Sequence, residues 1–310
     1  MPSPEDSLRA HHVLVSTDNP FQRRARLLQA LWREAQGLPI GEHRGQPLGS
    51  RLPMPRAQER LENFLTDNVR DCVRQEVVEA STSDGRLIQP DRLFANLLSS
   101  QPLCFNLFAE LQTDTVLATS VFARLLPGRI GEVTAIRFEH SPGRGDLRFT
   151  GDRSAHDVFV EYTSPSGRRG FVGIEVKYHE AMRDKPSKPQ RRRDEIADAM
   201  GIFRPESRAA LADKPLEQMW RDHLLAGSLV LADVGFDEGT FAFVYPVRND
   251  RCAAAVARYA ETLTDGGTFR PWTLESVVEA LEAERDAAWV GEVRARYLDF
   301  DRVDALLRQT

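Results

Sequence analysis

Residues 170–178, Gly-Phe-Val-Gly-Ile-Glu-Val-Lys-Tyr, form the stretch of sequence that decides the fold. Seven of these nine residues are apolar or glycine, which is typical of a strand buried on both faces. Glu175 and Lys177 stand two positions apart, so in a strand both side chains point to the same face. Burying an unpaired charge is costly. The stretch therefore predicts a core strand that carries two charged side chains in need of partners.

A second apolar run precedes this strand and begins at Asp157. It continues through residues 158–162, Val-Phe-Val-Glu-Tyr, and is followed by residues 163–169, which are rich in turn formers. The pattern predicts a β-hairpin that brings Asp157 beside Glu175 and Lys177.

Two carboxylates that face one point make an oxygen-rich site of the kind that Mg²⁺ or Mn²⁺ prefers. A lysine at the same point can orient or deprotonate a water molecule, or stabilise a pentavalent phosphate. The alternative is a surface hairpin in which Glu175 and Lys177 form an ordinary ion pair. The apolar residues on both sides of the pair favour the buried site.

The Asp…Glu-x-Lys pattern of Asp157, Glu175 and Lys177 resembles the signature of the PD-(D/E)XK nuclease superfamily, which includes restriction endonucleases and resolvase-like enzymes. The proline of the signature is replaced by His156. More narrowly, residues 149–157 and 173–178 resemble a branch of restriction-endonuclease-like bacterial proteins. The resemblance covers residues 90–250, about half of the chain.

The resemblance implies an α/β fold of the α+β type, with a mixed sheet and a restriction-endonuclease-like αβββαβ core. The periodicities along the chain agree with that order, since a helix, three strands, a helix and a strand follow one another. We expect one globular unit with an N-terminal helical extension over residues 1–89, the nuclease-like core over 90–250, and a C-terminal helical extension over 251–310. The expected core elements are helix 90–113, strand 133–139, strands 157–162 and 171–178, helix 216–232 and strand 240–246.

The composition is that of an ordinary globular protein, with 41% hydrophobic and 28% charged residues. The N-terminus lacks the pattern of a signal peptide, and no apolar stretch approaches the roughly 18 residues of a membrane span. Three widely separated cysteines fit no zinc motif and favour a reducing, cytoplasmic setting. The net charge of −5 does not exclude nucleic acid, because a nuclease needs only a local basic track.

A further acid often joins the metal site in this superfamily, and two residues are candidates here. Glu110 lies late in a predicted helix, and Glu139 ends the first predicted strand. Because strand ends converge on the site in such sheets, we favour Glu139, although each acid is also compatible with an ordinary surface position. The expected metal ligands are therefore Asp157, Glu175, the Val176 carbonyl and Glu139.

Two groups of residues are candidates for nucleic-acid contacts. The segment 183–193 is strongly basic and holds two prolines, so we expect a loop rather than a helix. Its side chains either contact phosphates or form a solvated surface. On the helix that follows, Gln218 and Arg221 share a face and either hold a phosphate or belong to a buried polar network. The candidates for binding are Lys188, Arg191, Arg192, Arg193, Gln218 and Arg221.

The leading functional hypothesis is a Mg²⁺- or Mn²⁺-dependent endonuclease that hydrolyses DNA phosphodiester bonds. The resemblance implies products with 5′-phosphate and 3′-hydroxyl ends and suggests restriction-type defence. RNA as the substrate and a homodimeric assembly stay open. The competing hypothesis is a non-catalytic module, on a nuclease-like scaffold, that binds nucleic acid or a protein partner.

Overall fold

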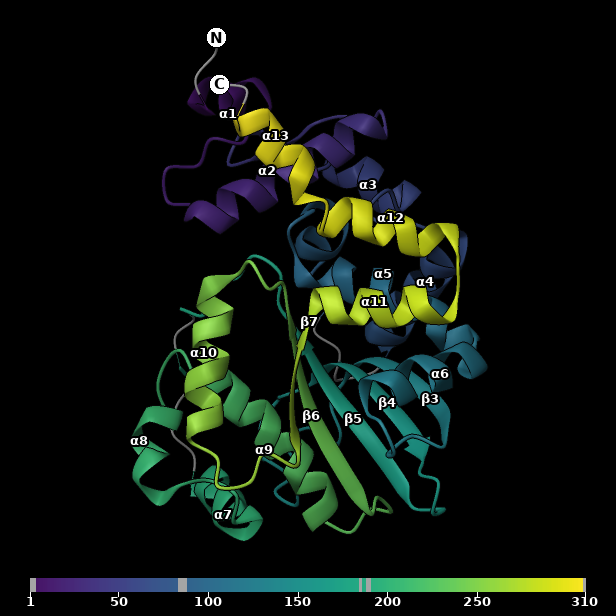
Figure 1. The fold of residues 1–310 in the computed structure, drawn as a ribbon, viewed down its shortest axis with the longest axis vertical. Helices are drawn as coiled ribbons and strands as arrows, with labels where there is room; N and C mark the ends of the chain where they lie inside the picture. Colours follow the sequence, from purple (N-terminus) through teal and green to yellow (C-terminus); the bar gives the residue numbers. More distant parts are fainter. Residues whose placement is uncertain (1–3, 83–87, 184–185, 188–190, 309–310) are drawn as a thin grey trace.

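The computed structural model describes residues 4–82, 88–183, 186–187 and 191–308. Its centre is a five-stranded mixed sheet in the order β3-β4-β5-β6-β7 (Figure 1). Strands β3, β4 and β5 pair antiparallel, whereas β6 and β7 are added in parallel. The strands are β3 (Glu132–His140), β4 (His156–Thr163), β5 (Arg169–Val176), β6 (Glu238–Tyr245) and β7 (Phe269–Thr273). This is the predicted mixed α/β fold, including the β4–β5 hairpin.

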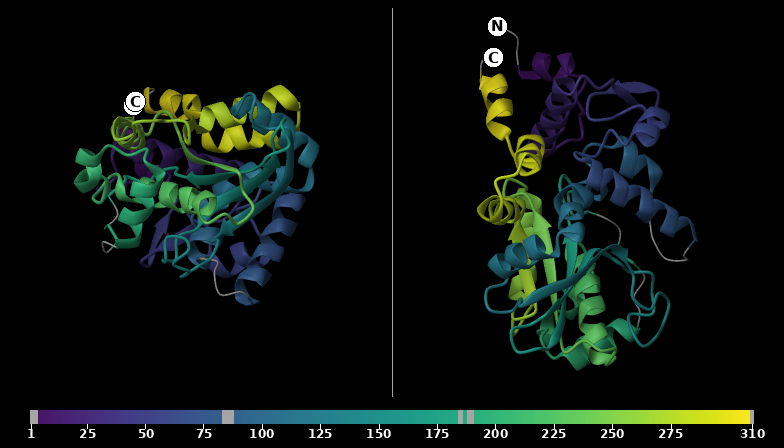
Figure 2. Two further views of the ribbon diagram at one scale, coloured as in Figure 1. Left: turned by 90° about the horizontal axis from the view of Figure 1, so that it is seen from below. Right: turned by 90° about the vertical axis from the view of Figure 1, so that its right-hand side faces the viewer.

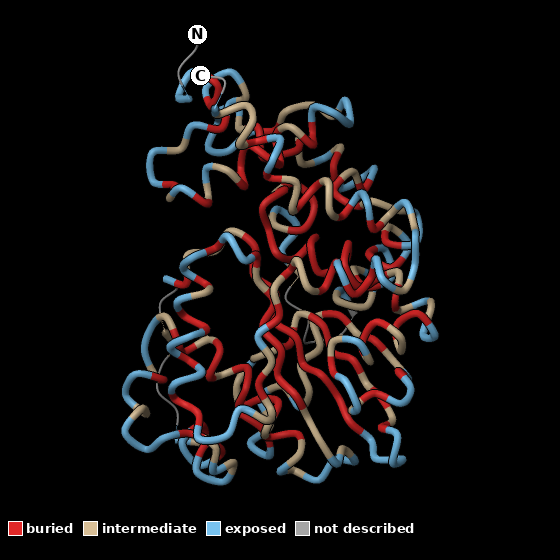
Figure 3. Tube along the Cα trace, in the orientation of Figure 1, coloured by how far each residue is buried: buried red, intermediate tan, exposed pale blue. Residues whose placement is uncertain are grey.

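Helices cover both faces of the sheet, and alternation along the strands assigns each side chain to one of two cores. Val158, Val172 and Ile174 belong to the core under α5 (Ser100–Thr113) and α6 (Thr115–Leu125). Phe159 and Phe171 belong to the core under α9 (Glu217–Leu231) and α10 (Asp250–Glu261). Figure 3 shows that β4, β5 and β6 are buried along most of their length. Odd-numbered residues of β4 and β5 therefore face α9.

The helices that come from the two ends of the chain lie together beyond one end of the sheet (Figures 1 and 2). The first core spans all of these parts, from Leu8 to Val303. No helix in the described residues is long and apolar enough to cross a membrane. The N-terminal helices are α1 (Pro4–Ala10), α2 (Pro20–Ala35), α3 (Met54–Arg60), α4 (Asp67–Thr82) and the π-helix η1 (Asp91–Ala95). The C-terminal helices are α11 (Leu274–Glu284), α12 (Ala288–Tyr297) and α13 (Phe300–Arg308).

Three local elements differ from the sequence-based expectation. Strand β7 lies within the segment expected to be helical, and it is a short edge strand that contains Pro271, so its periodicity is weak. In the N-terminal extension, the glycine- and proline-rich residues 37–55 favour a loop, but the structure forms a small hairpin there, β1 (Gly41–His43) and β2 (Gln46–Leu48). The expected loop over residues 183–193 is wrong at its end, where residues 191–193 are helical: α7 (Arg191–Met200) begins at Arg191, and its Ile196 is buried in the core under α9. Helices η2 (Pro205–Ser207) and α8 (Arg208–Leu211) follow α7.

One buried arginine ties the two ends of the chain together. Arg296 of α12 is completely buried, and its guanidinium lies 4.0 Å from the centre of the Trp32 ring. It donates hydrogen bonds to the Asn63 carbonyl (2.8 Å), to the Asn63 side-chain oxygen and to Gln29 Oε1 (3.1 Å). No acid is among these partners, so the charge is satisfied by carbonyl dipoles and an aromatic face.

We expect Arg296→Ala to lower the free energy of unfolding by about 3 kcal/mol or more, because it leaves several buried acceptors without a donor. Arg294→Ala is the matched control on the same helix, since Arg294 forms an exposed ion pair with Glu282. In Arg294→Ala the free energy of unfolding is expected to fall by less than about 1 kcal/mol. Urea denaturation of both variants measures the difference, and equal losses would contradict the structural role of Arg296.

Candidate active site

Three carboxylates stand in a row across three neighbouring strands. In β3–β4, Phe138 pairs with Val158 and His140 with His156, so Glu139 stands opposite Asp157. In β4–β5, Val158 pairs with Ile174, and one step further along the ladder Asp157 stands opposite Glu175. The row lies at the carboxyl end of β5, on the face that α9 covers. Asp157 and Glu175 are thus on the same side of the sheet, as the hairpin prediction required.

Asp157 is fixed by the backbone of the neighbouring strand. Its Oδ2 accepts a hydrogen bond of 2.8 Å from the N–H of Val176. In an extended strand the N–H and C=O of one residue point to the same edge. The Val176 carbonyl therefore faces the Asp157 side, whereas the next N–H, of Lys177, donates to Val244 O of β6 at 2.8 Å.

Glu175 and Lys177 form a buried pair. Lys177 Nζ lies 2.7 Å from Glu175 Oε1, and both side chains are less than a tenth exposed. Gln218 of α9 donates a second hydrogen bond to the same oxygen at 2.6 Å. Burial acts to lower the pKa of Lys177, but the carboxylates of Glu175, Glu180 and Asp157 outweigh it and raise that pKa. Lys177 is therefore a cation at neutral pH, which favours orienting a water molecule over deprotonating it.

The chain leaving β5 is held on several sides. Glu180 turns back, and its Oε2 accepts a hydrogen bond of 2.7 Å from the N–H of Tyr178. Asn249, which caps α10, donates to the carbonyls of Tyr178 and Glu180, and Gln22 of α2 donates to the carbonyl of His179. Two distant parts of the chain, α2 and the start of α10, thus help to fix the segment in which Lys177 lies.

Glu139 is the one of the two candidate acids that reaches this site. Its backbone has a φ of 47°, in the left-handed region that non-glycine residues rarely adopt. Gln101 of α5 donates to its Oε1 at 3.0 Å. Burial, and then repulsion by Glu175, raise the pKa of Glu139 to about 7 in spite of this hydrogen bond. Glu110 lies elsewhere and accepts hydrogen bonds from Thr66 and Asn68.

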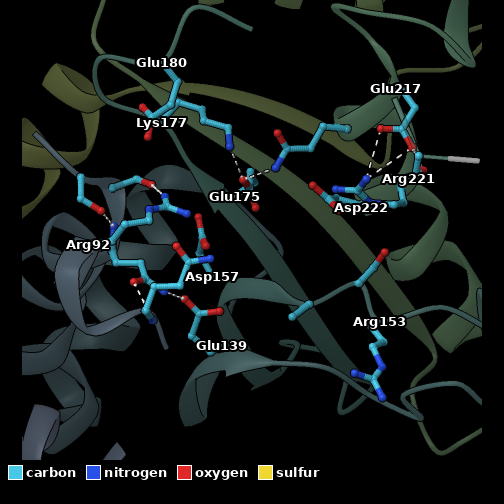
Figure 4. A pocket seen from close by; sticks show the side chains of 18 of the residues that line it. Arg92, Glu139, Arg153, Asp157, Glu175, Lys177, Glu180, Glu217, Arg221 and Asp222 are labelled. Carbon is cyan, nitrogen blue, oxygen red and sulfur yellow. Dashed lines mark hydrogen bonds and ion pairs between the residues drawn. The ribbon is translucent and has the colours of Figure 1, made fainter. Parts of the chain in front are cut away.

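A cavity of about 640 Å³ opens at this site, and its lining includes Asp157, Glu175, Lys177 and Glu139 (Figure 4). Burial and the charges of Glu175 and Glu139 raise the pKa of Asp157 well above its usual range. An excess of buried negative charge is the electrostatic condition that a bound cation relieves.

The donor set suits Mg²⁺ or Mn²⁺ and not zinc. Among the described residues, no group of three or more His, Cys, Asp or Glu side chains is arranged so that it could hold a metal ion by itself. Mg²⁺ is usually bound by one or two carboxylates, with water and substrate phosphate as the other ligands, rather than by an all-protein cage. Asp157 and Glu175, with the Val176 carbonyl beside them, fit that description, and Glu139 would add a third carboxylate.

The α9 wall of the cavity is a network of paired charges. Arg221 lies 3.1 Å from Glu217 Oε2 and 3.6 Å from Asp222 Oδ1. Asp222 was missed by sequence reasoning, although its carboxylate lines the cavity and its Oδ2 has no hydrogen-bond partner in the described part of the chain. Burial raises the pKa of Asp222 to about 8; Arg221 opposes this shift and Glu175 adds to it. Gln218 and Arg221 thus combine cavity lining with a polar network.

The basic residues of α7 have three different environments. Arg193 is buried and pairs with Asp152 (2.7 Å) and Glu217 (2.8 Å). Arg192 donates to the carbonyls of Arg148 and Phe149. Arg191 is 92% exposed and pairs with Glu195. Lys188, the remaining candidate of this segment, lies outside the described residues.

Sequence reasoning also missed the wall contributed by residues 89–101, which carries Arg92 and Gln101 into the cavity. No periodicity could reveal it, because its position depends on how α5 packs against the sheet. The only available signal was the cluster of Ser, Gln and Asn side chains before a buried helix.

A family model described as the PD-(D/E)XK nuclease superfamily matches residues 16–299. The chain belongs to the PD-(D/E)XK nuclease superfamily. The match extends well beyond residues 90–250 and takes in the helices from α2 to α12. Neither the curated proteins nor the solved structures include a significant match to the chain. The superfamily consists mainly of hydrolytic nucleases that typically use divalent metal ions, and nuclease activity is the general expectation.

The raised pKa of Glu139 gives a testable pH dependence in EDTA. A folded-state pKa of about 7, above the ordinary 4.5, means that the folded state loses stability as the pH rises between these values. We expect Glu139→Gln to remove this loss, which is at most about 3 kcal/mol, so that the variant gains stability over the wild type at pH 8 and not at pH 4.5. Thermal unfolding across this range measures the gain.

The matched control is Glu132→Gln, an exposed carboxylate on the same strand. Its effect on stability should be small at both pH values. A Glu139→Gln variant that gains no stability at high pH would show that Glu139 carries no burial penalty.

Proposed function

We propose that the protein is a metal-dependent endonuclease that hydrolyses DNA phosphodiester bonds. The observation that supports the proposal best is the arrangement at the end of β5, where Asp157, Glu175 and Lys177 meet in one cavity. A structural ion-pair network would have satisfied its charges, whereas here three neighbouring carboxylates share one lysine.

In this proposal, Asp157, Glu175, Glu139 and the Val176 carbonyl hold Mg²⁺ or Mn²⁺, which when bound activates water and stabilises charge on the phosphate. Lys177 donates hydrogen bonds as a cation, to the attacking water or to a non-bridging phosphate oxygen. Gln218 keeps Glu175 oriented through its 2.6 Å hydrogen bond. Hydrolysis that leaves 5′-phosphate and 3′-hydroxyl ends follows from the superfamily resemblance.

The substrate and setting are also part of the proposal. The partner is DNA, with contacts from Arg221 and Gln218 in the cavity and from Arg191 and Arg192 on α7. Restriction-type defence in the cytoplasm is the role that the superfamily suggests, and the three cysteines are free and buried, in keeping with a reducing setting. The competing proposal is a non-catalytic binding module, but such a module has no need for an intact Asp…Glu-x-Lys set.

We expect Asp157→Ala, Glu175→Ala and Lys177→Ala each to lower plasmid cleavage in Mg²⁺ or Mn²⁺ by at least about a hundredfold. The losses should not add in the triple variant, because the three groups act together. Gel assays of supercoiled plasmid measure cleavage, and EDTA should abolish it in the wild type.

Glu161→Ala serves as the control for these variants. Glu161 lies on β4 like Asp157, but its partners are Arg137 and Arg169, outside the cavity. Circular dichroism checks that every variant is folded. Unchanged cleavage in Lys177→Ala would remove that residue from the mechanism.

We expect substitutions of the exposed and the buried arginines of α7 to have different effects on DNA binding and stability. Arg191→Gln is expected to reduce the slope of log K against log salt for DNA binding by about one, and to leave stability unchanged. Arg193→Gln is expected to destabilise the fold by about 3 kcal/mol, because it leaves Asp152 and Glu217 without their buried partner. Filter binding over a salt series and urea denaturation measure the two effects. If the salt slope is unchanged in Arg191→Gln, Arg191 is an ordinary surface residue that does not contact DNA.

A further inference from the structure

The cations of the cavity divide into those engaged by acids and those that are not. Lys177 is paired with Glu175, and Arg193 and Arg221 are paired with acids on the α9 side. Arg92 and Arg153 line the same cavity without an ion pair within the described residues, but Arg153 is exposed whereas Arg92 is half-buried and acts on the carboxylate row. The one hydrogen bond of Arg92 in the described part of the chain is a long contact of 3.5 Å from Nη2 to Ser100 Oγ. A guanidinium has five N–H donors, so most of those of Arg92 remain available.

Figure 4 shows that the side chain of Arg92 lies beside Asp157 and Glu139, on the opposite side of the carboxylate row from Arg221 and Asp222. The charge of Arg92 also acts on Glu139, where it lowers the pKa against the dominant effect of burial. Arg92 is thus close enough to influence the carboxylate row but is not neutralised by it.

The backbone that carries Arg92 is firmly held. Arg92 belongs to η1, a single π-helical turn, and such turns often occur at functional sites. Leu93 and Phe94 are buried in the core, and Asn63 donates to the carbonyl of Leu93 at 2.9 Å. Asp91 pairs away from the cavity with Arg51. The side chain of Arg92 is therefore presented from a rigid support, as a preorganised binding group must be.

Within residues 89–101, the side chains that line the cavity carry hydrogen-bond donors and no carboxylate, since Asp91 is not among them. A negatively charged strand approaching the row of carboxylates meets repulsion that Lys177 alone does not offset, since Glu175 already engages it. Arg193 of α7 and Arg221 of α9 offer less compensation than an unpaired arginine, because Asp152, Glu217 and Asp222 already neutralise part of their charge. The other side chains of the Arg92 wall that line the cavity are Gln89, Asn96, Ser99, Ser100 and Gln101.

We propose that Arg92 binds a phosphate group of the substrate strand and directs that strand along the wall formed by residues 89–101. This inference rests on the proposed function for its choice of substrate. The guanidinium fork of Arg92 matches two phosphate oxygens at once. Arg92 is a positioning residue for the phosphate, supplied by the N-terminal part of the chain rather than by the basic segment before α7.

The first test is DNA binding in EDTA, measured by fluorescence anisotropy of a labelled oligonucleotide duplex over a salt series. Arg92→Gln should raise Kd by about tenfold and reduce the salt slope by about one. Arg92→Lys should restore the slope but only part of the affinity, because the charge returns without the fork. Arg258→Gln is the control, since Arg258 lies on α10 outside this cavity and its change removes the same charge.

The second test uses inorganic phosphate and does not depend on DNA cleavage. Phosphate should raise the melting temperature of the wild type and of Arg258→Gln, and it should raise that of Arg92→Gln much less. If the wild type neither binds nor cuts DNA while this phosphate difference persists, the proposed function fails and the anion site stands. If the wild type cuts DNA and Arg92→Gln matches Arg258→Gln in both tests, the role of Arg92 is wrong.

Discussion

The site depends above all on the register between β4 and β5. The hydrogen bond from the Val176 N–H to Asp157 Oδ2 is possible only when Val158 stands opposite Ile174. A slip of one residue would turn Asp157 toward the core under α5 and carry Phe159 with it. The register is therefore set by the same apolar alternation that builds the two cores. A change of register would remove the large aromatic side chains from the core under α9. These side chains therefore hold the carboxylates in position without lining the cavity.

This register gathers carboxylates that repel one another, and the rest of the structure has to hold them there. Asp157 and Glu139 have raised pKa values because burial and mutual repulsion disfavour their charged forms. The supporting contacts come from distant segments: Gln101 on Glu139, Gln218 on Glu175, and Asn249 and Gln22 on the chain after Lys177. The folded protein thus sacrifices some stability to keep these carboxylates together.

The sequence was most informative where one short-range period decides the outcome. Period-two alternation with a turn between the runs was enough to place Asp157, Glu175 and Lys177 together, and a strand end was enough to favour Glu139 over Glu110 as the acid that reaches the cavity. The sequence was not informative where contacts between residues far apart in the chain decide the local structure. Nothing near Arg193 indicates that Asp152 and Glu217 will bury it, and this pairing helps to make a helix of a segment that looks like a loop. Arg92 and Asp222 depend in the same way on how whole helices pack.

These remote contacts bear on the organisation of the chain. The segment after Lys177 is held by Gln22 of α2, and the hydroxyl of Tyr178 donates to the carbonyl of Tyr297 in α12. Arg296, next to Tyr297, donates a hydrogen bond to Gln29 of α2. Helices from the two ends of the chain thus meet next to the segment that follows β5. Residues 89–101 supply one wall of the cavity. We infer that the central segment does not form the site by itself: the helices on either side of it position the lysine and complete the cavity, and the nuclease-like site is a property of the whole globular unit.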